Sequence, residues 1–395
     1  MSDLGYLERL LDGATVEWVP LGQVAKILRG KRLTKSELSE DEEYPVYHGG
    51  LDPLGYYGEA NRPANSVMVI NVGASAGTVG FSSVDFWSSD GCFTLAHADE
   101  INSKFLYHFL IGHEHHIKGQ VRVAGIPTLD AFVVEKILIP IPCPDDPQKS
   151  LAIQGEIVRI LDAFTALTAE LTAELTAELT ARKTQYNHYR NHLLSFDGAD
   201  VEWRVLGDVV DFQNAKPHEK LVTSDGDVAL LTAGFISSEG KSLRLVRRED
   251  VLTPAFVNDV AMVMSDLPNG RALAKTFFVD ANDRYAANQR VCLLRVKEAA
   301  AYLPRFLHYV LNRNAQLLAY DSGYDQTHLK KDWILGVKVP VPPLAEQARI
   351  VSILDKFDTL TSSISEGLPR EIALRQKQYE YYRNLLLSFP KGDQA

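Results

Sequence analysis

The chain has 395 residues, of which 46% are hydrophobic and 23% charged, and its formal net charge is −10. This composition suits soluble globular domains with real cores, and the acidic balance argues against a protein that simply coats DNA. The three cysteines, Cys92, Cys143 and Cys292, form no CxxC pair, so neither a disulfide framework nor a zinc site is indicated.

The N-terminal segment MSDLGYLERLLDG is acidic and amphipathic, without a basic region followed by a long apolar run. It does not resemble a signal peptide, and no apolar stretch of about 18 residues predicts a membrane span. We therefore expect a cytoplasmic protein.

Residues 1–147 predict a first body of mixed α and β structure. The motif DGATVEWVPLGQV opens it at Asp12, and the apolar, β-branched run VMVINVG (67–73) predicts a buried strand. The run SKFLYHFLIGHEHH has helical spacing of large apolar residues. The prolines of IPIPCP then bar a helix until just after residue 144.

Loops of this body offer side chains that could read base edges. The dense basic run LRGKRLTK stands in a region with only 11 basic against 20 acidic residues, although a solvated turn is the alternative interpretation. The loops NVGASAGTVG and GIPT follow, and their glycines permit close backbone approach. The DNA-binding candidates here are Arg29, Lys31, Arg32, Lys35, Ser75 and Thr128.

The segment HEHH (113–116) is the one place that suggests a metal. His113 and His116 could share a helix face, but no third ligand and no HExxH pattern accompany them. A solvated helix end is favoured, and no metal site is predicted.

Residues 148–196 predict the first long helix. Large apolar residues recur at steps of three or four, and TAEL is repeated three times from Thr168 to Leu179. Because the repeat period is 4.0 and the helix period is 3.6, each copy adds about 6 Å of helix and turns the leucine stripe by about 40°. The spacer candidates are Thr168, Leu171, Leu175 and Leu179. The alternative is a low-complexity helix whose length has no consequence.

The glutamates of the repeat form a like-charged row, Glu170, Glu174 and Glu178. At i,i+4 spacing this is a small penalty on an isolated helix. A solvated face is the simple interpretation, and pairing across a helix interface with Arg370, Arg375 or Lys377 is the alternative.

The second half of the chain repeats the first. DGADVEWRVLGDV opens a second body (197–342) at Asp197, VPVP closes it, and residues 343–395 predict a second long helix. Residues 157–196 align with 350–389 without a gap, and 20 of the 40 positions are identical. Gly367 and Pro369 predict a break near 366–369, where Pro369 would restart the helix.

The loops of the second body correspond in place to those of the first. FQNAKPHEK follows the opening motif, SDLPNGR follows the buried strand VAMVMSD, and DQTHLKK precedes the closing prolines. The DNA-binding candidates are Asn214, Lys216, Asn269, Arg271, Gln326, His328, Lys330 and Lys331, and Gln213 and His218 lie on the first of these loops.

These features predict an α+β protein with two pseudo-twofold-related bodies joined by two long antiparallel coiled-coil helices. The bodies would lie at opposite ends of the helix pair. The N-terminal YLERLLDGATVEW resembles the end of such a helix leading into a body, so the two ends of the chain should lie close together.

Almost the whole chain resembles the specificity subunit of type I restriction–modification systems. The resemblance rests on the VEWxxLG openings, the IPIP and VPVP closures, and the IVxILDxFxxLT and QYxxYRxxLLSF helix motifs, while the TAEL copies mark one subgroup. It implies two target recognition domains, each reading one half of a bipartite DNA site. The helices would set the gap and dock two methyltransferase subunits. Neither basic loop has the Gly-Gly-Thr-Pro type seen in many relatives, so the half-sites cannot be inferred.

The same resemblance implies the partners and cofactors. Double-stranded DNA, two methyltransferase subunits and restriction/translocation subunits are expected, and this chain would have no catalytic residue. S-adenosylmethionine for adenine N6 methylation, and ATP and Mg²⁺ for restriction, would belong to the partner subunits, with no cofactor in this chain.

Three other functions are the alternatives to a DNA-specificity subunit. A single-chain DNA methyltransferase would need an NPPY- or DPPY-type motif and a glycine motif for its cofactor, and DLPNG (266–270) is not such a motif. A purely structural coiled-coil connector does not explain two large bodies with matched loops. A coiled-coil DNA-binding scaffold outside restriction stays open.

Overall fold

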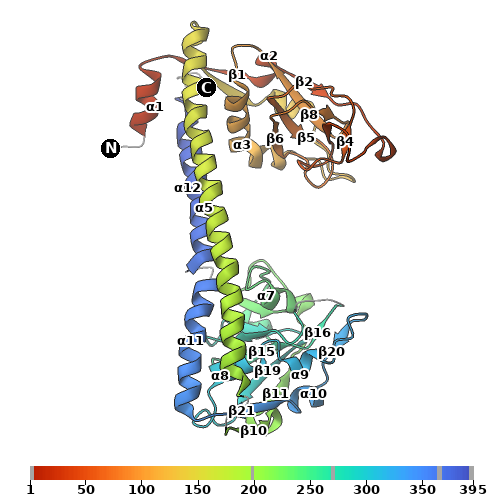
Figure 1. The fold of residues 1–395 in the computed structure, drawn as a ribbon, viewed down its shortest axis with the longest axis vertical. Helices are drawn as coiled ribbons and strands as arrows, with labels where there is room; N and C mark the ends of the chain where they lie inside the picture. Colours follow the sequence, from red (N-terminus) through yellow and green to blue (C-terminus); the bar gives the residue numbers. More distant parts are fainter. Residues whose placement is uncertain (1–3, 197–199, 268–271, 363–366, 391–395) are drawn as a thin grey trace. The chain divides into compact units, whose positions relative to one another are not determined.

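The structure, a computed structural model, describes residues 4–196, 200–267, 272–362 and 367–390 (Figure 1). The chain forms two compact units. Unit 1 combines Met1–Glu174 with Ile372–Ala395, and unit 2 is Leu175–Glu371. Unit 1 therefore takes both ends of the chain, as the N-terminal motif predicted. None of the described helices is long and apolar enough to cross a lipid bilayer.

The elements of the first half follow the predicted order of a mixed body and a long helix. They are α1 (Leu4–Leu11), β1 (Val16–Pro20), α2 (Leu21–Val24), β2 (Ala25–Arg29), the 3-10 turn η1 (Lys35–Glu37), β3 (Tyr44–Tyr47), β4 (Tyr56–Tyr57), β5 (Ser66–Ile70), β6 (Val79–Ser82), β7 (Trp87–Ser88), β8 (Cys92–His97), α3 (Ser103–Gly119), α4 (Ala131–Glu135), β9 (Leu138–Pro142) and α5 (Pro147–Ser195).

The second half repeats this order with a few additions. Its elements are β10 (Glu202–Val205), α6 (Leu206–Val209), β11 (Val210–Asn214), η2 (Glu219–Leu221), β12 (Val228–Leu231), α7 (Ala233–Ser237), β13 (Leu245–Val246), η3 (Arg248–Asp250), β14 (Pro254–Ala255), β15 (Val260–Val263), β16 (Ser265–Asp266), β17 (Thr276–Phe278), β18 (Tyr285–Ala287), β19 (Val291–Val296), α8 (Pro304–Leu311), α9 (Ala315–Leu318), β20 (Thr327–His328), α10 (Lys331–Leu335), β21 (Lys338–Val341), α11 (Leu344–Ser362) and α12 (Gly367–Leu386).

The opening and closing motifs of each body pair with one another. β1 is antiparallel to β9, with Trp18 opposite Pro140, and β10 is antiparallel to β21, with Trp203 opposite Pro340. Prolines are tolerated because each of these sheets has only two strands, so the side that lacks an N–H needs no partner. The repeated VEW and PxP motifs thus close each body beside the start of its helix.

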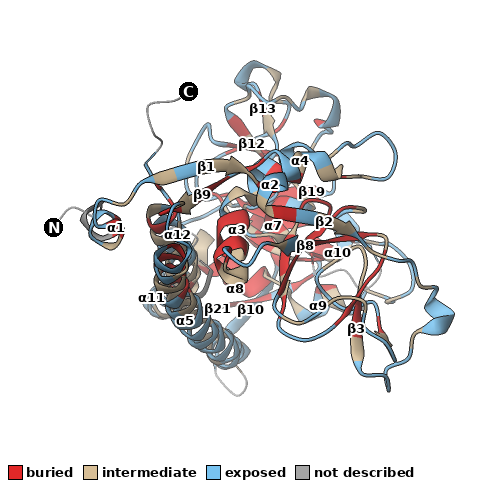
Figure 2. Cartoon of the chain, turned by 90° about the horizontal axis from the view of Figure 1, so that it is seen from above, coloured by how far each residue is buried: buried red, intermediate tan, exposed pale blue. Residues whose placement is uncertain are grey.

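A four-stranded sheet forms the centre of each body. Its strand order is β2-β8-β5-β6 in unit 1 and β11-β19-β15-β17 in unit 2. All neighbouring strands are antiparallel, and α3 or α8 covers one face of the sheet with buried aromatic and leucine side chains, such as Phe105 and Phe306. Six of the 17 residues of α3 are buried, against six of the 49 residues of α5, which is mostly exposed or intermediate (Figure 2).

Each body is tied to its helices by one buried glutamine. In unit 1 the side chain of Gln154 accepts a hydrogen bond from the Asn102 backbone N–H (2.8 Å) and donates to the Glu100 carbonyl (3.0 Å). In unit 2 Gln347 accepts from the Leu303 N–H (2.8 Å) and donates to the Ala301 carbonyl (3.1 Å). Both glutamines have no exposed surface, so these bonds fix the body where the helix begins.

An acidic residue two turns further on adds a second tie in each unit. Asp162 binds Lys104 (2.6 Å) and His108 (3.0 Å), and Asp355 binds Arg305 (2.7 Å) and Tyr309. The carboxylates keep 37% and 41% of their surface exposed, so solvent screens these pairs and each contributes little on its own. The glutamines therefore carry the larger share of the docking.

The helices run antiparallel within each unit and meet through equivalent aromatic pairs. In unit 1 the rings of Phe164 and Tyr382 stack at 5.4 Å, and in unit 2 Phe357 and Tyr189 stack at 5.7 Å. In the sequence repeat, Phe357 is the counterpart of Phe164 and Tyr382 is the counterpart of Tyr189, at an offset of 193 residues. The two copies of the repeat therefore pack on each other in the same way.

The second helix is interrupted where the sequence predicted. α11 ends at Ser362 and α12 begins at Gly367, with Pro369 in its first turn. Gly367 has a φ of +76°, and a Cβ there would lie 2.6 Å from the Thr359 carbonyl oxygen, so only glycine fits. α5 carries no such interruption and is one helix of 49 residues.

Candidate nucleic-acid interface

The loops singled out in the first body meet at one edge of its central sheet, which we call loop edge 1 (residues 30–35, 71–78, 88–91 and 120–129). Arg29 ends β2 opposite Phe93, and Ile70 ends β5 opposite Cys92, so the loops after both strands leave the sheet on the same side. The segment around Thr128 joins them, because Val72 forms a β-bridge with Thr128 and Gly73 N–H donates to the Pro127 carbonyl.

The basic loop is held at this edge by contacts of its backbone. The Lys31 N–H donates to the Ser88 carbonyl (2.9 Å), and the Trp87 indole donates to the Lys31 carbonyl (2.7 Å). At Gly30 a Cβ would clash with the carbonyls of Ser88 and Ser89, which explains the glycine inside the basic run. These hydrogen bonds use only backbone groups of the loop. The side chains of Lys31 and Arg32 are exposed.

The second body gathers its loops in the same way at loop edge 2 (residues 215–218, 264–267, 272–275, 288–290 and 319–330). β11 ends at Asn214 opposite Cys292, and β16 pairs with β20 so that Ser265 lies opposite His328. The Gln326 side chain donates to the Ser265 hydroxyl (2.9 Å), and the Leu329 N–H donates to the Met264 carbonyl. Three loops far apart in sequence therefore share one exposed edge.

The structure places the predicted residues as follows. In unit 1 Arg29, Lys31, Arg32 and Lys35 are exposed, and Ser75 and Thr128 are half-buried. In unit 2 Asn214, Lys216, Gln326, His328, Lys330 and Lys331 are exposed. Asn269 and Arg271 lie outside the described residues. Thr168, Leu171, Leu175 and Leu179 are half-buried on α5.

Two parts of the predicted basic surface have other roles. His218 is fully buried: its ring accepts from the Leu252 N–H and bonds the Lys216 carbonyl, so it shapes the loop and cannot reach DNA. The ammonium groups of Lys330 and Lys331 lie over the rings of Trp333 (5.0 Å) and Phe212 (5.6 Å). These cation–π contacts orient both lysines at the start of α10.

The turn at the centre of each loop edge is absent from the sequence predictions. This turn leads into the middle strand of the sheet, at Asp90–Gly91 in unit 1 and Gln289–Arg290 in unit 2. The N–H of Asn71 donates to the Gly91 carbonyl, and that of Met264 donates to the Arg290 carbonyl, so the two turns are equivalent. A lone polar pair before a strand gives no sequence signal, and only the strand order puts it between the other loops.

The two turns present different chemistry. Asp90 lies 3.2 Å from the Nδ1 atom of His48, and both side chains are about two-fifths exposed. Arg290 has a left-handed backbone (φ 70°) and an exposed side chain with no partner within the described part of the chain. An exposed guanidinium suits guanine, whereas a carboxylate accepts from cytosine.

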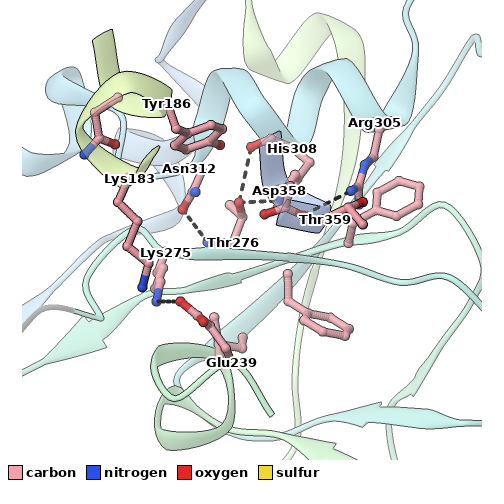
Figure 3. A pocket seen from close by; sticks show the side chains of 14 residues that line it. Lys183, Tyr186, Glu239, Lys275, Thr276, Arg305, His308, Asn312, Asp358 and Thr359 are labelled. Carbon is pink, nitrogen blue, oxygen red and sulfur yellow. Dashed lines mark hydrogen bonds and ion pairs between the residues drawn. The ribbon is translucent and has the colours of Figure 1, made fainter. Parts of the chain in front are cut away.

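One pocket of about 480 Å³ lies in unit 2 where the body meets α5 and α11 (Figure 3). The Thr276 hydroxyl lies 2.9 Å from Nδ1 of His308 and also donates to the His308 carbonyl, while Lys275 faces Glu239. Burial, reinforced by the charges of Arg305 and Arg190, lowers the pKa of His308 to about 3. This neutral, hydrogen-bonded imidazole is part of the packing and is no general base at neutral pH.

The described residues contain no group of three or more His, Cys, Asp or Glu side chains that could hold a metal. His113 instead bonds the Phe109 carbonyl through Nδ1 (2.9 Å) and packs on the Phe109 ring. The residues of HEHH lie in the C-terminal half of α3.

The fold and its two loop edges define a class: a duplicated binding protein that presents two equivalent sets of polar loops and joins them through shared antiparallel helices. Within this class the chain matches the family model "Type I restriction modification DNA specificity domain" twice, over residues 14–181 and 199–374. The chain belongs to this family of type I restriction–modification specificity subunits, which recognise DNA and are not catalytic.

Similar proteins cover the full length. The EcoR124I/EcoR124II specificity subunit of Escherichia coli is 36% identical over 100% of this chain and 99% of its own length. A putative type I specificity subunit of Haemophilus influenzae is 35% identical over 97% and 98%. A chain from a structure of type I restriction–modification complex assembly has a TM-score of 0.61 at 16% identity, covering 96% of this chain and 98% of that one, and so shares the fold.

Proposed function

We propose that each unit reads one half of a bipartite, asymmetric DNA site through its loop edge. The observation that carries this proposal is the convergence of three separate loops and a central turn on one edge in both units, with different side chains in each. Equivalent geometry with unlike chemistry, for example Asp90 against Gln289 and Gly91 against Arg290, suits two different half-sites.

The helices then set the unread gap between the half-sites and dock two methyltransferase subunits that methylate adenine N6. Support comes from α5, which is one uninterrupted helix of 49 residues contributing to both units. A copy of TAEL changes its length by about 6 Å, and B-DNA rises about 3.4 Å per base pair, so one copy corresponds to about one or two base pairs.

Partner subunits supply what this chain lacks under the proposal. S-adenosylmethionine would bind the methyltransferase subunits, and ATP and Mg²⁺ the restriction/translocation subunits. The net charge of −10 supports weak binding of duplex DNA by the isolated chain, because long-range attraction of phosphates must then come from the partners.

A methylation map of the host genome, with and without this gene, tests the proposal. We expect loss of one split motif with an adenine methylated in each half. A map that stays unchanged, or that loses an unsplit motif, contradicts it. Binding of a single bipartite sequence by the isolated chain, tight and selective at ~150 mM salt, would contradict the role assigned to the partners.

A further inference from the structure

The most exposed large apolar side chains of the described residues all lie on the loop edges. They are Tyr324 (88% exposed), Val123 (78%), Ile126 (71%) and Leu267 (66%). Single exposed apolar residues are normal on a protein surface, but four on the loop edges, two in each unit, indicate a common purpose.

In unit 1 the two side chains occupy the tip of a closed turn. The Arg122 N–H donates to the Thr128 carbonyl (2.9 Å) and the Thr128 N–H donates to the Arg122 carbonyl (3.0 Å). Gly125, at φ +90°, makes the reversal, and Val123 and Ile126 stand on either side of it. The two hydrogen bonds between Arg122 and Thr128 close the base of the turn. They hold its apolar tip in a defined, exposed position.

In unit 2 the two exposed apolar side chains come from two separate segments. Asp266 pairs with Thr327 at the end of the β16–β20 ladder, so Leu267 follows one strand and Tyr324 precedes the other, both beyond the same end. Two carboxylates here accept hydrogen bonds from the loop backbone: Asp266 accepts from the Leu267 and Ala272 N–H groups, and Asp321 accepts from the Gly323 N–H. Asp325, beside Tyr324, is exposed.

We propose that these apolar tips are wedges that enter the DNA at the recognised half-sites, with Tyr324 stacking on a base in the half-site read by unit 2. The inference rests on the proposed function. Apolar side chains inserted at a base step unstack it, and an aromatic ring then replaces the lost stacking. Exposed cations on the same edge, such as Arg290 and Lys216, suit the phosphates and bases beside such a wedge.

The test uses the full chain assembled with its methyltransferase subunits and duplexes of the mapped motif, with 2-aminopurine placed at successive positions. Wild-type protein is expected to raise the fluorescence several-fold at one step of the unit 2 half-site. Tyr324→Ala should abolish that rise and weaken specific binding by about 5- to 150-fold, while Tyr324→Phe retains both.

Phe256→Ala is the matched control. Phe256 is 43% exposed and precedes β15, at the opposite end of the same sheet, so both signals should be unchanged. Equal fluorescence and affinity in wild type and Tyr324→Ala overturn the wedge. Loss of methyltransferase assembly in Tyr324→Ala, with the fluorescence retained, also overturns it and assigns the tip to a protein contact. If wild type itself selects no split motif, the proposed function fails instead.

Discussion

The buried glutamines give the sharpest prediction about how the bodies are held. Replacing Gln154 with Leu keeps a side chain of similar size but leaves the Asn102 N–H and the Glu100 carbonyl without partners. Each of the two unsatisfied groups costs about 1–3 kcal/mol, so unit 1 should lose about 2–6 kcal/mol. Gln154→Glu keeps the acceptor but places a buried carboxylate against the Glu100 carbonyl, so its cost should be at least as large as that of Gln154→Leu.

Hydrogen exchange resolved by segment measures this loss in each unit separately. Protection of residues 100–106 should fall in Gln154→Leu, and protection of residues 301–307 should fall in Gln347→Leu, each without the other. Gln376→Leu, at an exposed position on α12, is the control and should change protection by less than about 0.5 kcal/mol. A Gln154→Leu effect as small as that control, or one spread equally over both units, would refute the docking argument.

Three further outcomes are expected. Arg290→Ala should relax one position of a single half-site and weaken binding by about 1–3 kcal/mol, leaving the other half-site and the gap unchanged in a methylation map. Because His308 has a pKa of about 3 when folded and about 6.5 when unfolded, its stabilising contribution is complete above pH 6.5 and is lost as the pH falls towards 3. Urea titrations should therefore show wild type losing up to about 1.4 kcal/mol per pH unit relative to His308→Gln across that window; parallel curves would contradict it. Changing Glu170, Glu174 and Glu178 to Gln should alter stability by less than about 0.5 kcal/mol at low salt, since all three are exposed and Glu178 pairs with Arg182 of its own helix; a larger loss would indicate pairing between helices.

Much of the fold could be predicted because it is written as a repeat. The gapless alignment of 157–196 with 350–389 predicted two matching helices, and Gly367 and Pro369 located the break between α11 and α12. These features depend on local helix chemistry and on comparing one half with the other. Both are visible in a single sequence.

The rest depends on contacts between distant segments. Nothing in the sequence distinguishes Gln154 from an exposed helical glutamine, because its partners lie 52 and 54 residues away. His218 looked available for DNA because its neighbours are polar, yet Asn288 and Leu252 enclose it. Likewise, Arg290 is recognised as part of loop edge 2 only from the strand order, which puts β19 between β11 and β15.

The structure of α5 bears on the hypothesis that the number of TAEL copies sets the gap between the half-sites. Leu171, Leu175 and Leu179 are half-buried on one continuous helix, whereas the aligned part of the second half contains Gly367, which starts α12 with a φ of +76°. Only α5 can gain or lose whole tetrapeptides without disturbing a break. Its length is therefore the variable that the gap should follow.

Deletion of Thr176–Leu179, followed by a methylation map, tests this central claim most directly. We expect both half-sites to keep their bases while the gap between them shortens by about one or two base pairs, as a helix shortened by about 6 Å requires. An unchanged gap, or altered bases in either half-site, would contradict the account.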